Sequence, residues 1–362
     1  MPFDIDRMQP KGPPATLLED VAASAYGGGQ LDFSRYGTLV YLAGKTVQNH
    51  HQLLRIDASG KSERLFAPDN FNNLALSPDG KQLAVTIGRG DLDRYVFDLQ
   101  REISTKLTTN AAGIGTIWAP DGKHLVYATA PGKNSGMMWS RADGSTEPQM
   151  LVPGDLRFPV IPFCISPDGR RVYFQVLPRG LLSSVTIDTR DPDHPKTGKP
   201  ETILNEPVSG ASISPDGRWL AYTSGNSGLP QIIVRPLGAD GKPREGLWQI
   251  SASGGRQPLW SRAGRQLLFL SPDSHVMAVE YSASGDSFQA QKPRLWTEKP
   301  VATVYTGTAP FDRRSYDLTP DGKRIITWDP DEVRDRAKTN LHITVETNWF
   351  GEVERRFAHG GR

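Results

Sequence analysis

The sequence predicts an all-β protein, a β-propeller built from four-stranded antiparallel blades. Two observations predict this fold class. A turn phrase of the type Ser-Pro-Asp-Gly recurs along the whole chain, and each copy lies between two apolar segments of strand length. The chain of 362 residues also contains 36 Gly and 29 Pro, which favours many short strands joined by tight turns over long helices.

The turn phrase occurs in clean, variant and degenerate copies. The clean copies span 76–81, 165–170 and 213–218, the variants 118–123 and 318–323, and the degenerate copies 33–37 and 260–265. Their glycines are Gly37, Gly80, Gly122, Gly169, Gly217, Gly264 and Gly322. Most intervals match the roughly 40–50 residues of a four-stranded blade, and the last one is longer. We therefore expect seven blades; the alternative is six blades plus a degenerate hairpin, because the first copy lacks Pro-Asp.

Each residue of the phrase has a role in a turn. Proline presets φ, serine or threonine bonds back to the turn, and glycine takes the positive-φ position that closes a hairpin. The aspartates are therefore interpreted as turn residues rather than catalytic carboxylates. Alternating segments follow the turns, such as Leu83–Val85 and Val172–Phe174. Their β-branched and aromatic residues suit sheets that are packed on both faces.

The chain is expected to form one propeller domain over residues 1–362. The last repeat has a predicted C strand at 340–345 but no fourth strand of its own. The N-terminal segment 1–21, through residues 15–18, is expected to complete the last blade, because ring closure removes exposed sheet edges. Residues 348–362 are expected to form a C-terminal tail or a short helix.

A second segment near the N-terminus, 2–6, also resembles a C strand. Two C strands would then compete for one blade. The simplest hypothesis is that the chain begins within a blade, as a piece of a longer polypeptide.

Composition limits the partners. With 42 basic and 40 acidic residues the formal charge is +2, which predicts no strong attraction for nucleic acid or anionic membrane. No segment approaches the ~20 apolar residues that span a bilayer, so no membrane insertion is expected. The N-terminus has acids where a signal peptide has bases, so the chain as written is expected to be cytoplasmic. The single cysteine, Cys164, excludes an intrachain disulfide and is interpreted as a core residue.

The sequence contains no complete catalytic motif. Gly44-Lys45-Thr46 lacks the upstream glycine of a phosphate-binding loop, and there is no Gly-x-Ser-x-Gly elbow. The seven histidines show no metal-ligand spacing. We therefore expect neither cofactor nor metal, and an enzyme is not favoured. Ligands from several blades could still meet in a central channel, so a metal-assisted lyase or lactone hydrolase is the alternative.

The predicted function is a non-catalytic binding or sensor module for a protein or a small-molecule ligand, acting as a monomer. Its site is expected on the loop face, where the D-to-A and B-to-C connections surround the channel mouth. Arginine and tyrosine anchor interfaces, and the pair Arg313-Arg314 could clamp a carboxylate or a phosphate. The candidate residues are Asn72, Arg94, Tyr95, Arg157, Arg256, Arg313 and Arg314.

The repeats resemble the TolB-like propeller repeat, a relative of the WD-type repeat, over nearly the whole chain. At the ends, Pro2–Arg7, Gly12–Pro14, Gly37–Tyr41 and Asn348–Phe350 resemble the C-terminal propeller of bacterial eukaryotic-like serine/threonine kinases. That resemblance implies a periplasmic or other extracytoplasmic sensing part of a larger, membrane-anchored signalling protein. The kinase Gly-rich loop, His-Arg-Asp and Asp-Phe-Gly motifs are missing from this sequence, so kinase activity is not implied.

Overall fold

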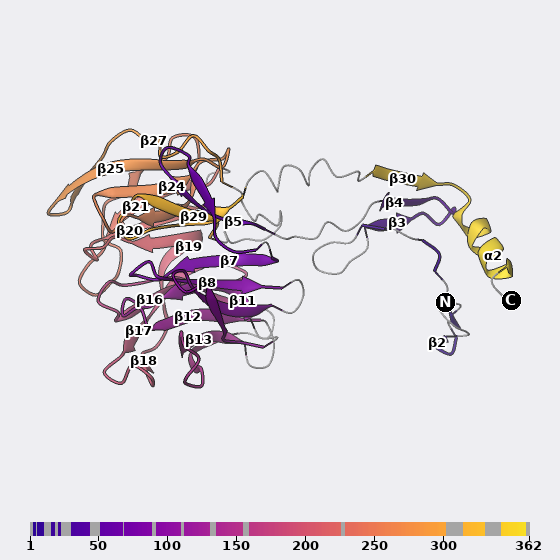
Figure 1. Ribbon diagram of the computed structural model, residues 1–362, viewed down its shortest axis with the longest axis horizontal. Coiled ribbons are helices and arrows are strands. Elements are labelled where there is room, and N and C mark those ends of the chain that lie inside the picture. Colours follow the sequence, from indigo (N-terminus) through magenta and orange to yellow (C-terminus); the bar gives the residue numbers. More distant parts are fainter. Residues whose placement is uncertain are drawn as a thin grey trace. The chain divides into compact units, whose positions relative to one another are not determined.

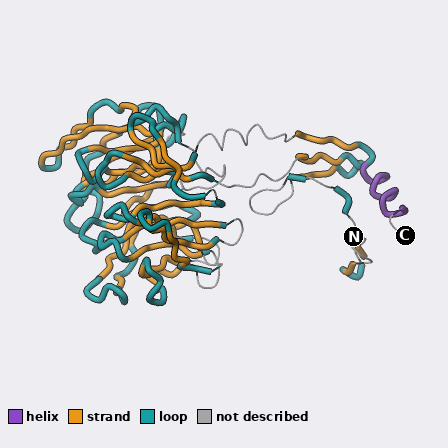
Figure 2. Tube along the Cα trace, viewed as in Figure 1, coloured by secondary structure: helices purple, strands orange, loops and turns teal. Residues whose placement is uncertain are grey.

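The computed structural model describes residues 3–4, 6–10, 16–18, 21–22, 30–43, 51–67, 69–88, 92–109, 112–130, 135–154, 159–225, 229–301, 314–329 and 342–359. The chain divides into two compact units, a small one comprising Met1–Gln48 and Arg334–Arg362 and a main one comprising Asn49–Val333. Strands and loops make up the described part of the main unit (Figure 2). No described helix has both the length and the apolar composition needed to cross a membrane.

The described part of the main unit contains six antiparallel sets of at least four strands, named here the first to sixth blades (Figure 1). The first blade comprises β7 (Phe71–Leu76), β8 (Gln82–Ile87), β9 (Asp93–Asp98) and β10 (Ile103–Lys106). The second comprises β11 (Ala112–Trp118), β12 (His124–Thr129), β13 (Gly136–Arg141) and β14 (Gln149–Pro153). The third comprises β15 (Val160–Ile165), β16 (Arg171–Val176), β17 (Leu181–Asp188) and the first half of β19 (Glu201–Ile213), with β18 (Lys196–Thr197) beside β17.

The remaining three blades continue round the ring. The fourth comprises the second half of β19, β20 (Trp219–Ser224), β21 (Gln231–Pro236) and β22 (Trp248–Gln249). The fifth comprises β23 (Arg256–Trp260), β24 (Gln266–Leu270) and β25 (Val276–Ser284), which pairs with both β26 (Ser287–Ala290) and β27 (Arg294–Leu295). The sixth comprises β28 (Tyr316–Leu318), β29 (Arg324–Trp328), β5 (Leu53–Asp57) and β6 (Ser62–Arg64). The four-stranded antiparallel blades predicted from the repeat are thus confirmed.

The sixth blade joins the two ends of the main unit. β29 pairs with β5, so that Trp328 lies opposite Leu53 and Arg324 opposite Asp57. Figure 1 shows β5, from the indigo end of the colour scale, beside β29, from the yellow end. This differs from the closure predicted through residues 15–18, because β5 and β6 complete the last blade and the described part of that segment, 16–18, forms no strand in it. Local patterning could not choose between these segments, since both are short runs with apolar residues.

The small unit contains its own short elements. β3 (Leu31–Phe33), β4 (Leu39–Ala43) and β30 (His342–Glu346) form a three-stranded sheet, and β1 (Phe3–Asp4) pairs with β2 (Gln9–Pro10). The helix α2 (Trp349–His359) lies within the predicted C-terminal segment. Of the predicted C strand at 340–345, the described residues 342–345 belong to β30 and pair with β4, not with the last blade. Because the first turn copy lies between β3 and β4, the count of seven blades is not confirmed, and six blades plus a degenerate hairpin agree with the described sheets.

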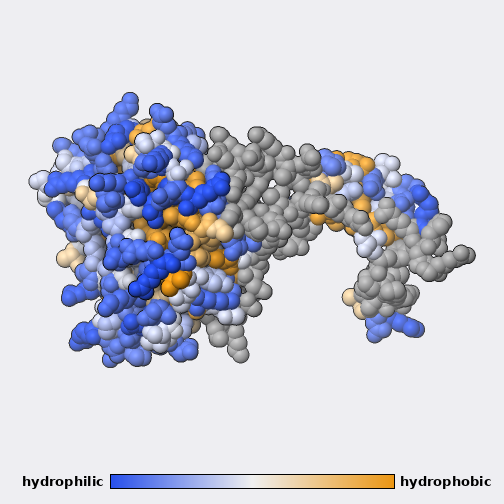
Figure 3. Space-filling view, in the orientation of Figure 1, coloured by the Kyte–Doolittle hydropathy of each residue, from blue (hydrophilic) through white to orange (hydrophobic). Residues whose placement is uncertain are grey.

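Apolar clusters lie between the blades of the main unit. Each of six clusters joins two blades that are neighbours in the ring, and one of them joins the sixth blade to the first through Leu53, Trp328 and Phe71. Indole groups add a second link: Nε1 of Trp118 donates to the carbonyl of Ala75 at 2.8 Å, from the second blade to the first. The outermost strands β6 and β10 are exposed, and hydrophilic residues cover most of the face of this unit that Figure 3 shows. The packed interfaces fix the inner strands, which line the candidate site.

Candidate ligand-binding site

The innermost strand of each blade contributes to one central cavity. We count positions backward from the turn residue that is proline in most blades, and this count aligns the six strands. The position three residues before it is occupied by Ala75, Ile117, Cys164, Ser212, Leu259 and Asp317, and all six line the same cavity. Asp317 is the only charged residue in this ring. The repeat therefore places equivalent backbone positions round a channel. The side chain at each position differs between blades, and these differences determine the chemistry of the channel wall.

The part of the central cavity lined by this ring is called the wide compartment, and it has a volume of about 400 Å³. Turn prolines of four blades line it, namely Pro78, Pro120, Pro167 and Pro215, so it opens at the turn face. Its walls are mainly apolar and include Phe163, Trp118 and Trp260. An apolar cavity with a few polar groups is typical of a site for a small ligand or a peptide side chain.

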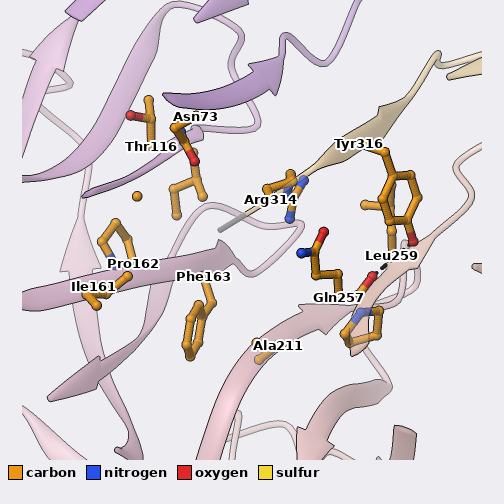
Figure 4. A pocket seen from close by; sticks show the side chains of 14 residues that line it. Asn73, Thr116, Ile161, Pro162, Phe163, Ala211, Gln257, Leu259, Arg314 and Tyr316 are labelled. Atoms are coloured by element: carbon orange, nitrogen blue, oxygen red, sulfur yellow. Dashed lines mark hydrogen bonds between the residues drawn. The ribbon is translucent and has the colours of Figure 1, made fainter. Parts of the chain in front are cut away.

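A narrow compartment of about 50 Å³ lies toward the other end of the inner strands. The position five residues before the turn proline supplies Asn73, Gly115, Pro162, Gly210 and Gln257 to its wall. Ile117, Phe163, Leu259 and Arg314 line both compartments. Figure 4 shows the head groups of Arg314 and Gln257 turned toward one another, with Asn73 and Thr116 on the opposite side of the space.

Irregular strand pairing shapes the narrow compartment. The pairing of the first and second strands shifts register within five blades, for example between Phe71 and Asn73 and between Arg256 and Leu259. A β-bulge of this kind re-aims side chains at the bulge. Two residues at these sites have left-handed backbone, Gly115 with φ of 82° and Gln257 with φ of 55°. The conformation is uncommon for a non-glycine residue, so the surrounding structure must hold Gln257 in place.

Hydrogen bonds to the sixth blade hold Gln257. Its Oε1 accepts from the backbone N–H of Ser315 at 2.8 Å, and its carbonyl accepts from the hydroxyl of Tyr316 at 2.9 Å. Its own N–H donates to Oγ1 of Thr223 at 3.2 Å. These bonds join three successive blades and fix the start of β28. Gln257 is therefore a positioning residue for the neighbouring Arg314.

Arg314 is the cation that lines both compartments. Its side chain is 26% exposed, and Nη1 donates to Oδ2 of Asp317 at 3.4 Å, its one partner among the described residues. The Asp317 carboxylate is also bound elsewhere: Oδ2 accepts from the backbone N–H of Leu76 and Oδ1 from that of Leu318, both at 2.9 Å. Backbone donors thus hold Asp317, while Arg314 keeps guanidinium donors for a ligand.

Two other polar groups face the cavities. Nδ2 of Asn73 has no hydrogen-bond partner among the described residues, although the side chain is buried and lines the narrow compartment. Cys164 lines the wide compartment, and burial raises the pKa of its thiol to about 12. The thiol therefore stays protonated near neutral pH and has little nucleophilic character. Arg314 and Nδ2 of Asn73 thus offer donors to an acceptor group such as a carboxylate, while the Asp317 carboxylate is bound by backbone N–H groups.

The seven residues predicted from the sequence have different positions. Arg314 lines the channel, whereas Arg94 is fully buried between the first and second blades. The Arg94 guanidinium lies 4.0 Å from the centre of the Tyr127 ring, and its Nε donates to Oγ1 of Thr116 at 2.9 Å. Burial lowers the pKa of Arg94 to about 10, opposed by Tyr127, so the group remains a cation. Such a residue has a structural role, and its position in the interior leaves no exposed head group for a partner.

The other predicted residues are not gathered at one place. Nδ2 of Asn72 donates to the carbonyls of Asn70 and Gly88, both at 2.9 Å, and so secures a strand end. Tyr95 lies among apolar neighbours that include Phe97, and Arg256 is half-buried at the start of β23. Arg157 and Arg313 lie outside the described residues. Sequence reasoning missed Asn73, Gln257 and Asp317, which the constant distance from the turn proline would have pointed to.

No group of three or more His, Cys, Asp or Glu side chains that could hold a metal ion occurs among the described residues. His124 is an example of a histidine that has a structural role instead. Its ring binds Oδ2 of Asp121 at 2.6 Å and Oδ1 of Asp193 at 3.1 Å, and it stacks on Trp139. This cluster joins the second blade to the loop that follows β17.

Comparison with solved structures identifies the fold as a TolB-like β-propeller. A TolB from Agrobacterium tumefaciens is similar at a TM-score of 0.54 and 19% identity, covering 78% of this chain and 99% of that one. Hydrazine synthase of Kuenenia stuttgartiensis is similar at a TM-score of 0.53 and 15% identity, covering 92% and 99%. A protein of Bacteroides uniformis described as a 6-phosphogluconolactonase is similar at 0.50 and 14%, covering 78% and 89%.

No protein-family model matches the sequence, and a search of curated proteins finds no match. The similar structures bear names with different activities, and their identities to this chain are below 20%. This likeness therefore shows the fold alone, and function has to be argued from the channel.

Proposed function

We propose that the protein is a binding module that receives a carboxylate carried on an apolar group in the central channel of its propeller. The observation that carries the proposal is the position of Arg314. Its guanidinium lines both the narrow and the wide compartment and has one partner among the described residues. A ligand entering from the turn face would place its apolar part in the wide compartment and its carboxylate beside Arg314.

The environment of Arg314 favours such a complex. A guanidinium binds a carboxylate through two parallel N–H donors, and a charge-assisted hydrogen bond is stronger where water is excluded. The surrounding walls are apolar, and Nδ2 of Asn73 offers a further donor in the narrow compartment. The small volume of this compartment, about 50 Å³, suits a single planar acceptor group and excludes a bulky one.

The proposed role in signalling follows from the resemblance of the sequence to the C-terminal propeller of bacterial eukaryotic-like serine/threonine kinases. If the chain is the propeller of a signalling protein, ligand binding in the channel would be the sensed event. The proposed site is the channel and not the loop connections, because the Arg94 side chain is buried and Tyr95 packs against an apolar cluster. Recognition of a whole protein on the loop face would need side chains outside the described residues, such as Arg157 and Arg313.

Tryptophan fluorescence tests the proposal directly, because Trp118 and Trp260 line the wide compartment. The probes are 4-phenylbutyrate and its uncharged amide. We expect the acid to change the emission in a saturable way and to bind about tenfold more tightly than the amide. The variant Arg314→Gln should lose this preference for the acid and bind the amide as the unaltered protein does.

Arg55→Gln is the matched control. Arg55 lies in the same blade, its side chain is 23% exposed, and it pairs with Glu63 at 2.7 Å, but it does not line the channel. Equal binding of acid and amide, or equal loss in both variants, would contradict the proposal. Elemental analysis of protein purified without chelator belongs to the same experiment, since a stoichiometric transition metal would favour the lyase or lactonase alternative.

A further inference from the structure

The turn of the fifth blade departs from the repeat at the mouth of the channel. Arg262 stands where the other five blades have proline, and Ala263 stands where they have aspartate. In the other five blades the turn glycine has a φ of 66–74° and donates its N–H to the carbonyl three residues earlier. The fifth blade instead shows a bond from the N–H of Gln266 to the carbonyl of Gly264.

Arg262 lines the wide compartment and is exposed at its mouth. Its side chain has no hydrogen bond or ion pair with any described residue. Elsewhere the turn carboxylates are engaged; Oδ1 of Asp79, for example, accepts from the Ser77 hydroxyl at 2.7 Å and from the Lys81 N–H at 3.0 Å. Replacing such a stabilising turn by one with a free cation breaks a local rule of the fold, and sites of this kind tend to be functional.

The two arginines lie at different depths of one cavity. Arg262 follows Leu259 by three residues, and Leu259 is level with Asp317, to which the Arg314 guanidinium is bonded. β23 ends at Trp260 and Arg262 lies in the turn that follows, so these levels are separated by at most roughly 10 Å, the reach of three fully extended residues. A ligand that used both cations would need two anionic groups at about this distance.

We infer that the ligand is an extended acidic peptide, with its terminal carboxylate at Arg314 and an acidic side chain about three residues earlier at Arg262. This inference rests on the proposed function. An extended peptide advances about 3.3 Å per residue, so three residues span the separation of the two arginines. The peptide residues between these two positions would lie against the apolar wall of the wide compartment. At the mouth, the acidic side chain would approach the one turn in which the repeated aspartate is replaced, by Ala263.

The site offers one guanidinium group for each of the two anionic groups of this ligand. Arg314 and Asp317 together are neutral, and backbone N–H groups bind both oxygens of Asp317. Arg262 then adds one uncompensated positive charge at the mouth. A peptide with two negative groups would meet the two guanidinium groups in succession, whereas a neutral peptide would leave Arg262 in water at no cost.

The experiment measures the binding of three capped peptides by tryptophan fluorescence. Acetyl-Glu-Ala-Ala-Phe has both anionic groups, acetyl-Gln-Ala-Ala-Phe only the terminal carboxylate, and acetyl-Glu-Ala-Ala-Phe-amide only the side chain. In the unaltered protein the first peptide should bind about five- to tenfold more tightly than either of the others. Arg262→Gln should lower its affinity to that of the second peptide and should leave the second peptide unchanged.

The control is Arg265→Gln, in the same turn and also exposed but outside this cavity. The affinity change on losing both Arg262 and the glutamate should be smaller than the sum of the single changes, as for groups in contact. If binding depends on Arg314 but not on Arg262, the inference is wrong and the proposed function stands. If no peptide depends on Arg314, the proposed function fails as well. Equal binding of decanedioate, a dicarboxylate of similar span, would overturn the assignment to a peptide.

Discussion

At the scale of one residue, His124 shows that an aspartate of the repeated turn can also bind a buried side chain. Its side chain is 2% exposed and lies between the carboxylates of Asp121, in the turn, and Asp193, in the loop after β17. Arg141 also pairs with Asp193 at 3.3 Å, and Trp139 covers the ring. Burial by itself would lower the pKa of His124, but hydrogen bonds to Asp121 and then Asp193 raise it above its usual value.

We therefore predict a pH-dependent contribution of His124 to stability. A histidine whose pKa is raised by folding stabilises fully below its unfolded pKa of about 6.5, and loses this effect as the pH rises through the folded value. The free energy of unfolding in urea should exceed that of His124→Gln by about 1.5–3 kcal/mol at pH 6, as for charged hydrogen bonds, and by less at pH 9. His194→Gln, whose ring is 68% exposed, should show almost no difference. A His124→Gln difference that stays constant from pH 6 to 9 would refute this.

At the residue scale, the sequence could not distinguish arginines of the interior from arginines of the channel. Arg94 and Arg314 both follow polar loop segments, and the sequence pattern treats them alike. The first proved to be an interior residue stacked on Tyr127, and the second lines the channel. Burial depends on which other blade covers a residue, and this is decided by contacts far apart in the chain. Arg262 was visible in the sequence as a departure from the repeat, but its meaning needed the cavity.

At the scale of elements, the turns also contact each other round the mouth. A Cβ added at Gly217 would lie 3.8 Å from Cδ of Pro167, in the preceding blade, which is an ordinary contact. A Cβ added at Gly80 would lie only 2.7 Å from Cδ of Pro320, in the sixth blade. Both glycines have a φ of 74°, so their backbones are equally unsuited to other residues.

This pair makes a prediction with an internal control. Gly217→Ala should lower the free energy of unfolding by about 1–2 kcal/mol, the cost of a left-handed conformation for alanine. Gly80→Ala should cost about 1–3 kcal/mol more, because the added methyl group also overlaps the ring of Pro320. Urea unfolding of the two variants measures the difference. Equal costs would mean that the turns of the first and sixth blades are further apart than described here.

The turns and strands were the part of the fold that could be predicted. The hydrogen bonds of a Ser-Pro-Asp-Gly turn close within five residues, as from the Gln82 N–H to the Ser77 hydroxyl, so local sequence specifies them. The strands after the turns followed from alternation and β-branched residues. Bulges such as that at Gln257 could not be predicted, because they depend on hydrogen bonds to Ser315 and Tyr316 in the next blade.

At the scale of the whole molecule, closure of the ring depends on the contact between the sixth and first blades. Trp328 is fully buried there, and its ring stacks on Phe71 with centroids 6.1 Å apart. Asp317 adds a polar link, since its Oδ2 accepts from the N–H of Leu76 in the first blade. Without this interface both blades would expose an apolar face.

We predict that Trp328→Ala lowers the stability of the main unit by about 3–5 kcal/mol, as for other buried aromatic residues. Hydrogen exchange should rise first in β5 to β8, because these strands border the closure. Trp219→Ala is the matched control: Trp219 is also fully buried, but its cluster joins the fourth and fifth blades. Its loss should raise exchange in β20 to β25 instead. The same exchange pattern in both variants would argue against a separate closing interface.

The sequence by itself determined the class of this protein: a repeated turn, alternating strands and blade-sized intervals define a propeller, because each of these depends on short-range hydrogen bonds and on side-chain period. Only the tertiary structure decided that β29 pairs with β5, and that Arg314 and Arg262 share a cavity while Arg94 is buried. The pairing of β29 with β5 joins residues more than two hundred positions apart, such as Trp328 and Leu53, and the other features arise from contacts between neighbouring blades, such as Arg94 and Tyr127. Local patterns cannot specify such contacts, because every blade presents nearly the same strands to its neighbours.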